Sequence, residues 1–280
     1  MRKFKTITTS TCAAAFAGAA LAVLTTTGVM AGESEWFETQ GAKIRLISLP
    51  SANGQTIEAG LQILLDKGWK TYWRSPGDAG IPPLFDWSAS ENAAQVNVGF
   101  PVPDVFYENG MRSIGYEDGV TFSLIIESVA SGEDISLNGD LVIGVCEEVC
   151  VPVELSLDTI LPANADDRST FLRAALNDRP MTDVEAGVGA VSCDVEPIRD
   201  GMRLTARVEL PQMGRSEVAV LELPDRSIWV SEADVSREGE TLIATADLVP
   251  PEAAPFALAR QDVRITVIAG GQAVDIQGCG

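Results

Sequence analysis

Short apolar runs bounded by glycine or proline recur along most of the chain and constrain its fold more than any other feature. Apolar residues alternate with polar ones or form brief blocks, which is typical of strands with a buried face. Seven or more such strands separated by turns predict a β-sandwich in the first half of the chain. The expected strands are residues 42–49, 56–65, 68–74, 84–87, 95–100, 120–129, 135–146 and 149–157.

Residues 162–180 break this pattern. Asn164 or Asp166 is a candidate helix cap, and Pro180 is expected to end the helix. Residues 182–190 are expected to form a loop or linker. The apolar helix positions that share one face are Phe171, Leu172, Ala175 and Leu176.

Strand-like runs resume at residue 191, and Asp200-Gly201 and Gly270-Gly271 are hairpin signals. We therefore predict an all-β chain in which two β-sandwich domains, residues 32–161 and 191–280, are joined by a short helix-containing linker at 162–190. The second domain is expected to be the smaller one. Its expected strands are residues 193–198, 202–210, 218–223, 227–230, 241–248, 263–269 and 272–277.

The first 31 residues have the pattern of a secretory signal peptide. Arg2, Lys3 and Lys5 precede a run of apolar and small residues from 12 to 29, and Val29-Met30-Ala31 fits a cleavage site. Later segments fall short of the ~18–20 uninterrupted apolar residues of a membrane-spanning helix. The sequence thus predicts an exported periplasmic protein without stable membrane insertion.

Charge and composition exclude several classes of function. The net charge is -20, and loss of the three positive charges in residues 1–31 would lower it to -23. A surface of this charge repels nucleic acid and anionic lipid. The chain has no histidine, which excludes Ser-His-Asp and Cys-His catalysis and removes the commonest zinc and copper ligand. We predict neither a cofactor nor a metal.

Four cysteines follow the signal segment, and an exported protein is expected to pair them. Of the three possible connectivities, locality favours Cys146 with Cys150 and Cys193 with Cys279. The first bridge closes a loop of a few residues and is expected to stabilise by roughly 2 kcal/mol. The second closes a loop of about 87 residues and is expected to stabilise by about 4.6 kcal/mol. The long bridge therefore fits a structural role.

The short bridge lies in the stretch 144–152, where valines flank both cysteines and Glu147-Glu148 lies between them. This pattern predicts a tight hairpin with the two carboxylates at its tip. The spacing alone fits a local structural disulfide as well as a redox pair. The two carboxylates disfavour a thiolate by like-charge repulsion, so we expect either cysteine to be a slow nucleophile.

Three segments resemble the N-terminal periplasmic domain of DsbD-type thiol:disulfide interchange proteins, in particular the ScsB-like branch. They are Gly68-Trp69-Lys70-Thr71-Tyr72-Trp73-Arg74-Ser75-Pro76-Gly77-Asp78-Ala79-Gly80, Ile114-Gly115-Tyr116-Glu117 and Cys146-Glu147-Glu148-Val149-Cys150-Val151-Pro152. The resemblance covers roughly residues 36–160. The remainder resembles, more weakly, the second immunoglobulin-like region of ScsB-like proteins.

This resemblance implies immunoglobulin-like domains and a redox-active pair formed by Cys146 and Cys150. It also implies a cap at Asp104-Val105-Phe106-Tyr107, with Phe106 as the shield of the pair, and places Tyr72 near it. Ordinary core packing is the alternative for Phe106 and Tyr72, and Asp78 is expected to be a turn residue.

The implied electron donor is a membrane-embedded thiol reductant of the DsbD or CcdA type, and the implied acceptors are periplasmic thioredoxin-fold proteins. Full-length members of the family continue into a membrane-embedded domain and a thioredoxin-like domain, whereas this sequence ends at Gly280. We therefore expect a separate membrane protein to supply the electrons.

Two other classes of function compete with disulfide exchange. One is a non-catalytic binding or chaperone module in which both disulfides are structural. The other is copper handling related to copper tolerance or cytochrome c biogenesis, because thiolates bind Cu(I). The methionines available for copper are scattered along the sequence: Met111, Met181, Met202 and Met213.

Overall fold

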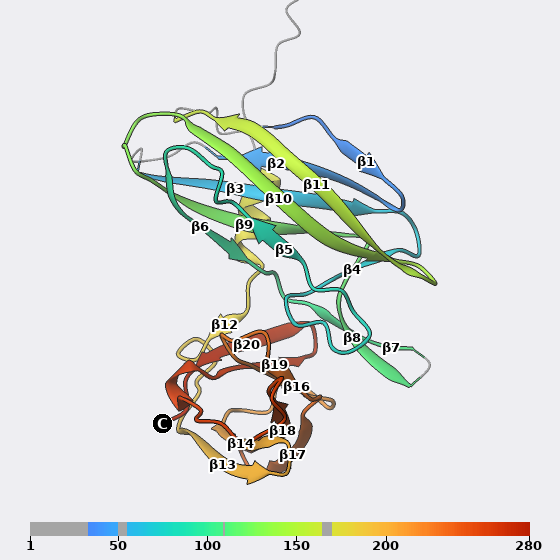
Figure 1. Ribbon diagram of the computed structural model, residues 1–280, viewed down its shortest axis with the longest axis vertical. Coiled ribbons are helices and arrows are strands. Elements are labelled where there is room, and N and C mark those ends of the chain that lie inside the picture. The colour runs from blue at the N-terminus through green and yellow to red at the C-terminus, as the bar shows by residue number, and fades with distance from the viewer. Residues whose placement is uncertain (1–32, 50–54, 109, 164–169) are drawn as a thin grey trace, which may run out of the picture.

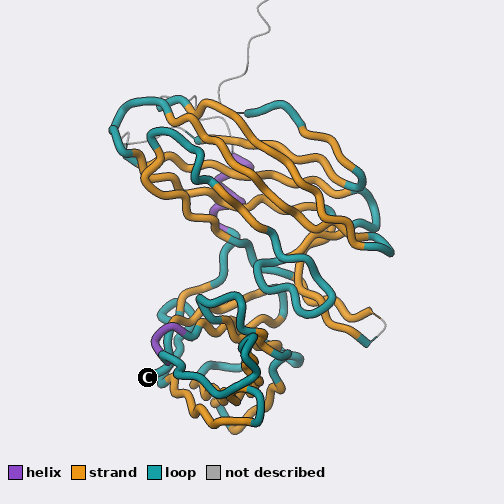
Figure 2. Tube along the Cα trace, in the orientation of Figure 1, coloured by secondary structure: helices purple, strands orange, loops and turns teal. Residues whose placement is uncertain are grey.

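The computed structural model describes residues 33–49, 55–108, 110–163 and 170–280. The predicted signal peptide and the candidate caps Asn164 and Asp166 lie outside these ranges. In the described part, strands form four sheets, and helix is confined to two short segments (Figures 1 and 2). The predicted all-β class is therefore confirmed. No helix among the described residues is long and apolar enough to cross a membrane.

Two sheets face each other in the N-terminal half. Sheet 1 has the order β1-β2-β3-β9-β6, and sheet 2 has the order β11-β10-β4-β8-β7, with β5 paired to β10. Between them lies an apolar cluster that includes Trp73 and Phe122, and Phe122 contacts Phe85, Phe100 and Tyr116. The strands are β1 Phe37–Thr39, β2 Ala42–Ser48, β3 Thr56–Leu65, β4 Lys70–Tyr72, β5 Leu84–Asp86, β6 Ala93–Gly99, β7 Asp104–Glu108, β8 Met111–Glu117, β9 Gly119–Ser128, β10 Ile135–Cys146 and β11 Cys150–Leu161.

The segment between residues 101 and 119 differs from expectation. The expected strands leave this segment out, but it forms the antiparallel hairpin β7–β8. Inward-facing Ile114 and Tyr116 anchor β8 in the core, and Tyr116 donates a hydrogen bond to the carbonyl of Pro101 over 3.0 Å. Packing of these side chains thus stabilises strands that the sequence analysis did not include.

The helix α1 spans Thr170–Asn177 and packs on the outer side of sheet 1. Leu172 is fully buried against Ile47 and Leu49. A Cβ atom at Gly60 would lie 2.5 Å from Cδ1 of Leu172, so the helix needs glycine on the strand below it.

The C-terminal half contains sheet 3, ordered β12-β20-β19-β15, and sheet 4, ordered β13-β14-β18-β16 with β17 beside β18. Gly270-Gly271 forms the predicted two-residue turn with positive φ angles of 60° and 72°. The other hairpin is shifted by one residue, because Ile198 pairs with Gly201 and leaves Arg199-Asp200 in the turn. The elements are β12 Met181–Thr182, β13 Val191–Ile198, β14 Gly201–Glu209, β15 Val218–Glu222, β16 Trp229–Val230, β17 Asp234–Glu238, β18 Thr241–Val249, the 3-10 turn Arg260–Asp262, β19 Arg264–Ala269 and β20 Gln272–Gln277.

The disulfide between Cys193 and Cys279 is present, with a Cα–Cα distance of 5.5 Å. It ties β13, the first strand of sheet 4, to the segment that follows β20 of sheet 3. Both cysteines are buried, at 5% and 2% exposure. This placement agrees with a structural bridge that joins the ends of the C-terminal half.

Sheet 3 is buried on both faces. On one face Ala219 and Val267 join the C-terminal apolar cluster, whereas on the other Val220 and Ile268 join the N-terminal one. The N-terminal apolar cluster therefore contains residues from both sides of the predicted linker. The division of the chain into two domains, ending at residue 161 and beginning at residue 191, stays a prediction.

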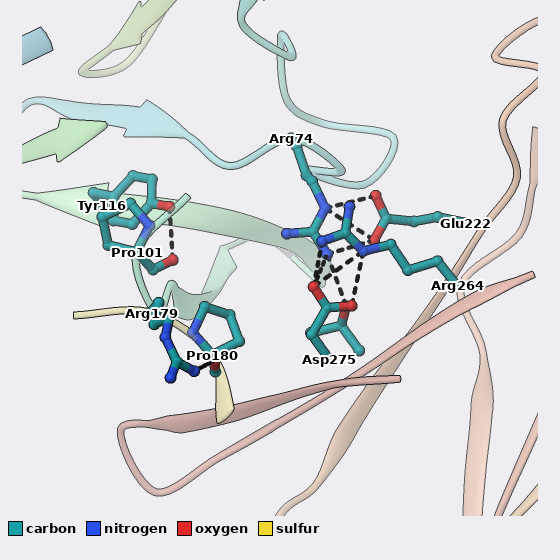
Figure 3. Close-up of polar contacts among 9 residues, drawn as sticks. Arg74, Pro101, Tyr116, Arg179, Pro180, Glu222, Arg264 and Asp275 are labelled. Atoms are coloured by element: carbon teal, nitrogen blue, oxygen red, sulfur yellow. Dashed lines mark hydrogen bonds and ion pairs between the residues drawn. The ribbon is translucent and has the colours of Figure 1, made fainter. Parts of the chain in front are cut away.

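A partly buried polar network lies on the same face (Figure 3). The guanidinium of Arg74 donates to the carboxylate of Glu222 over 2.9 Å and to Oγ1 of Thr266 over 2.9 Å, and lies 3.7 Å from Asp275. Arg264 pairs with the same aspartate.

Candidate functional site

The strands β10 and β11 form the predicted hairpin, and their last register pair is Cys146 with Cys150. The two sulfurs form a disulfide, and the Cα atoms lie 4.1 Å apart. Glu147, Glu148 and Val149 make the exposed turn. Cys146 is buried, at 4% exposure, while Cys150 is partly exposed. An attacking group from solvent therefore reaches the sulfur of Cys150 more easily.

The disulfide lies on the outward face of sheet 2. Val145 belongs to the apolar core of the sandwich, so the next residue, Cys146, and its register partner Lys70 point the other way. The loop of residues 75–83 covers this face: a Cβ atom at Gly144 would lie 2.6 Å from Cβ of Ile81. Glycine at 144 therefore lets the loop close over the sheet beside the cysteines.

Tyr72 provides the hydrogen bond to the disulfide. Its hydroxyl lies 2.9 Å from Sγ of Cys150 and donates, because a disulfide sulfur carries no hydrogen. The side chain is 2% exposed. Burial raises the pKa of Tyr72, and the nearby charge of Glu108 raises this pKa further. Tyr72 thus remains a protonated donor across the physiological pH range.

Lys70 is a buried cation beside the pair. It is 5% exposed and lies directly opposite Cys146 in the β4–β10 register. Its ammonium forms an ion pair with Glu108 and lies 5.3 Å from the centre of the Phe106 ring. The sequence reasoning missed Lys70 and Glu108. The sequence does contain a signal: Lys70 lies two positions before Tyr72 in an expected strand, so both side chains are expected on the same face.

The predicted cap, residues 104–107, lies on β7. Phe106 is partly exposed and approaches the site through Lys70, whereas Asp104 is exposed and Tyr107 is 68% exposed. The structure thus brings Tyr72, Lys70 and Phe106 together and leaves Asp104 and Tyr107 exposed to solvent.

Residues of the C-terminal half contact both segments that border the site. Arg112 of the β7–β8 hairpin lies 3.6 Å from the carboxylate of Glu232. Nε1 of Trp229 donates to Oδ1 of Asp78 over 3.0 Å. Asp78 therefore holds a contact between the two halves, which the expectation of a simple turn residue did not include.

Comparison with known proteins gives one family match. Residues 44–162 match the family "Thiol:disulfide interchange protein DsbD, N-terminal". This range contains Cys146, Cys150, Tyr72, Lys70 and the β7–β8 hairpin. No curated protein sequence matches the chain significantly.

A solved structure matches the fold. The N-terminal periplasmic domain of ScsB from Proteus mirabilis matches with a TM-score of 0.68 and 24% identity, over 89% of this chain and 99% of that chain. A marsupial T cell receptor covers 85% of this chain and 96% of its own, with 10% identity and a TM-score of 0.17. Residues 44–162 thus match the N-terminal domain family of DsbD, a thiol:disulfide interchange protein, and the chain shares the fold of the periplasmic ScsB domain.

Proposed function

We propose that this protein carries out thiol–disulfide exchange in the periplasm through a reversible disulfide between Cys146 and Cys150. The observation that carries the proposal is the asymmetry of the pair. Cys150 is partly exposed and hydrogen-bonded by Tyr72, while Cys146 is buried beside a lysine. The match of residues 44–162 to a thiol:disulfide interchange domain supports the same function.

Exchange proceeds in two substitutions at sulfur. A donor thiolate attacks Sγ of Cys150 and forms a mixed disulfide, while the bond between the cysteines breaks and Cys146 leaves with the electron pair. The second thiolate of the donor then attacks the donor's first sulfur, which is bonded to Cys150 in the mixed disulfide. Cys150 leaves as a thiolate. The donor ends as a disulfide and the pair as a dithiol, so two electrons have passed to this chain.

Tyr72 and the cap residues have separate roles in this proposal. The Tyr72 hydroxyl donates a hydrogen bond to the departing Cys150 thiolate, because it already contacts that sulfur. Phe106 limits access to the pair, and Asp104 and Tyr107 are exposed residues of the same strand. A membrane-embedded thiol reductant is the donor, and thioredoxin-fold proteins are the acceptors. Both carry the accessible thiol or disulfide that the chemistry requires.

The experiment compares two single-cysteine variants of the pair, with the Cys193–Cys279 bridge intact. Each is mixed with oxidised glutathione, and the adduct is followed by mass spectrometry. We expect Cys146→Ser, which leaves Cys150 free, to form the adduct at least tenfold faster than Cys150→Ser. If neither variant reacts while it is folded and both react after denaturation, the pair is a structural bridge. The alternative of a binding module with inert disulfides would then hold.

A further inference from the structure

The electrostatics of the leaving sulfur point to a further residue, and this inference rests on the proposed exchange function. Cys146 is 4% exposed, so a thiolate formed there is poorly solvated. Burial without a partner raises a thiol pKa and makes the thiol a poor leaving group. The observed fold places a buried cation opposite this sulfur.

Lys70 is that cation. In an antiparallel pair, directly opposite side chains lie on the same face with Cβ atoms about 4.5–5.5 Å apart. Lys70 and Cys146 are such a pair. The ammonium contacts Glu108, and the charge of Glu108 also acts on Tyr72, whose hydroxyl lies 2.9 Å from Sγ of Cys150. The lysine, the glutamate, the tyrosine and the disulfide therefore form one cluster.

We propose that Lys70 is the counter-ion of the Cys146 thiolate and that reduction transfers its ammonium from Glu108 to that sulfur. In the oxidised state Lys70 holds the β7–β8 hairpin through Glu108 and the face of Phe106. When the bond between the cysteines breaks, the electron pair and negative charge go to Cys146, and Lys70 neutralises them.

The other charges that face the cluster oppose this effect only in part. Glu147 and Glu148 in the hairpin turn and Glu117 on β8 are exposed, and solvent screens them. Glu108 is the remaining carboxylate, and its side chain is 60% exposed. Tyr72 is neutral. The buried ammonium therefore outweighs the exposed carboxylates at Cys146.

The test of this proposal measures the pKa of the Cys146 thiol and needs no exchange reaction. In the Cys150→Ser background, thiolate absorbance of Cys146 is followed against pH. We expect a pKa below the ordinary value of ~8.5. Adding Lys70→Met should raise this pKa by at least about one unit, a tenfold loss of thiolate. Lys70→Arg should preserve it. The matched control Lys67→Met removes a nearby exposed lysine and should leave it unchanged.

Equal pKa values with and without Lys70→Met, or equal shifts for the Lys70 and Lys67 variants, would overturn the proposal. If Lys70→Met fails to fold, the Cys146 pKa is measured in Glu108→Gln instead. This variant frees the Lys70 ammonium from its ion pair and is expected to lower the Cys146 pKa. An unchanged pKa would contradict the proposal. These outcomes are independent of the reduction potential: a pair too stable for exchange would refute the proposed function and leave the lysine result standing.

Discussion

Removing the guanidinium of Arg74 tests whether a partly buried ionic network stabilises the contact between the two halves. The Arg74 side chain is 7% exposed and stacks on the Trp73 ring, with 3.9 Å from Cζ to the ring centre. Its partner Glu222 is 17% exposed. Loss of one partner from such a pair leaves an uncompensated charge and costs about 3–5 kcal/mol. Asp275 keeps Arg264 as a partner, so we expect Arg74→Met to cost about 3 kcal/mol.

The assay is urea unfolding at pH 7, with the free energy of unfolding taken from the midpoint and slope. The matched control is Arg203→Met, because the ion pair of Arg203 with Asp247 is exposed at 50% and 33%. We expect a loss of at most ~1 kcal/mol there. The double variant Arg74→Met/Glu222→Met should recover part of the loss, since it removes both charges. A loss for Arg74→Met equal to that of the control would refute the reasoning.

Three further predictions concern the site and the C-terminal half. Tyr72→Phe removes the hydroxyl at Cys150 and should raise the Cys150 thiol pKa in the Cys146→Ser background, measured by thiolate absorbance, by about one unit; an unchanged value would contradict the hydrogen bond. Replacing Cys193 and Cys279 together by alanine should lower the unfolding free energy by about 4 kcal/mol, whereas a loss under about 1 kcal/mol would contradict the structural role. Burial would raise the pKa of Glu217, but Arg237 and the amide of Met213 more than offset this and lower it below 4.5. The carboxylate thus contributes stability at neutral pH that disappears as the pH falls through its lowered pKa, so the deficit of Glu217→Gln should shrink below about pH 4 in pH-dependent urea unfolding; a deficit independent of pH would contradict this linkage.

The strands with the clearest patterns could be predicted from the sequence. Residues 56–65, 135–146 and 272–277 match β3, β10 and β20 at both ends. In these segments apolar residues alternate with polar ones or form blocks, and each strand ends at a turn that the sequence indicates. Both disulfides could also be anticipated, because locality alone favours these pairings and the structure forms them.

The β7–β8 hairpin could not be predicted in this way. Gly, Asn and Asp interrupt its apolar residues, and only packing of Ile114 and Tyr116 into the core reveals the strand. Lys70 was missed because a lysine in a strand is ordinarily exposed, and its burial depends on Phe106 and Glu108 from a distant segment. The Arg74 network was missed for the same reason, since Glu222 lies 148 positions away along the chain.

The reduction potential of the Cys146–Cys150 pair tests the central claim most directly. The folded protein is equilibrated with thiol–disulfide buffers of stepped potential, and the free thiols of this pair are trapped and counted by mass. Cys193 and Cys279 serve as the internal comparison, because both are buried. We expect the Cys146–Cys150 potential to lie well above ~−300 mV and above that of the other bridge. A value below ~−300 mV would mark an inert structural disulfide and contradict the proposed exchange function.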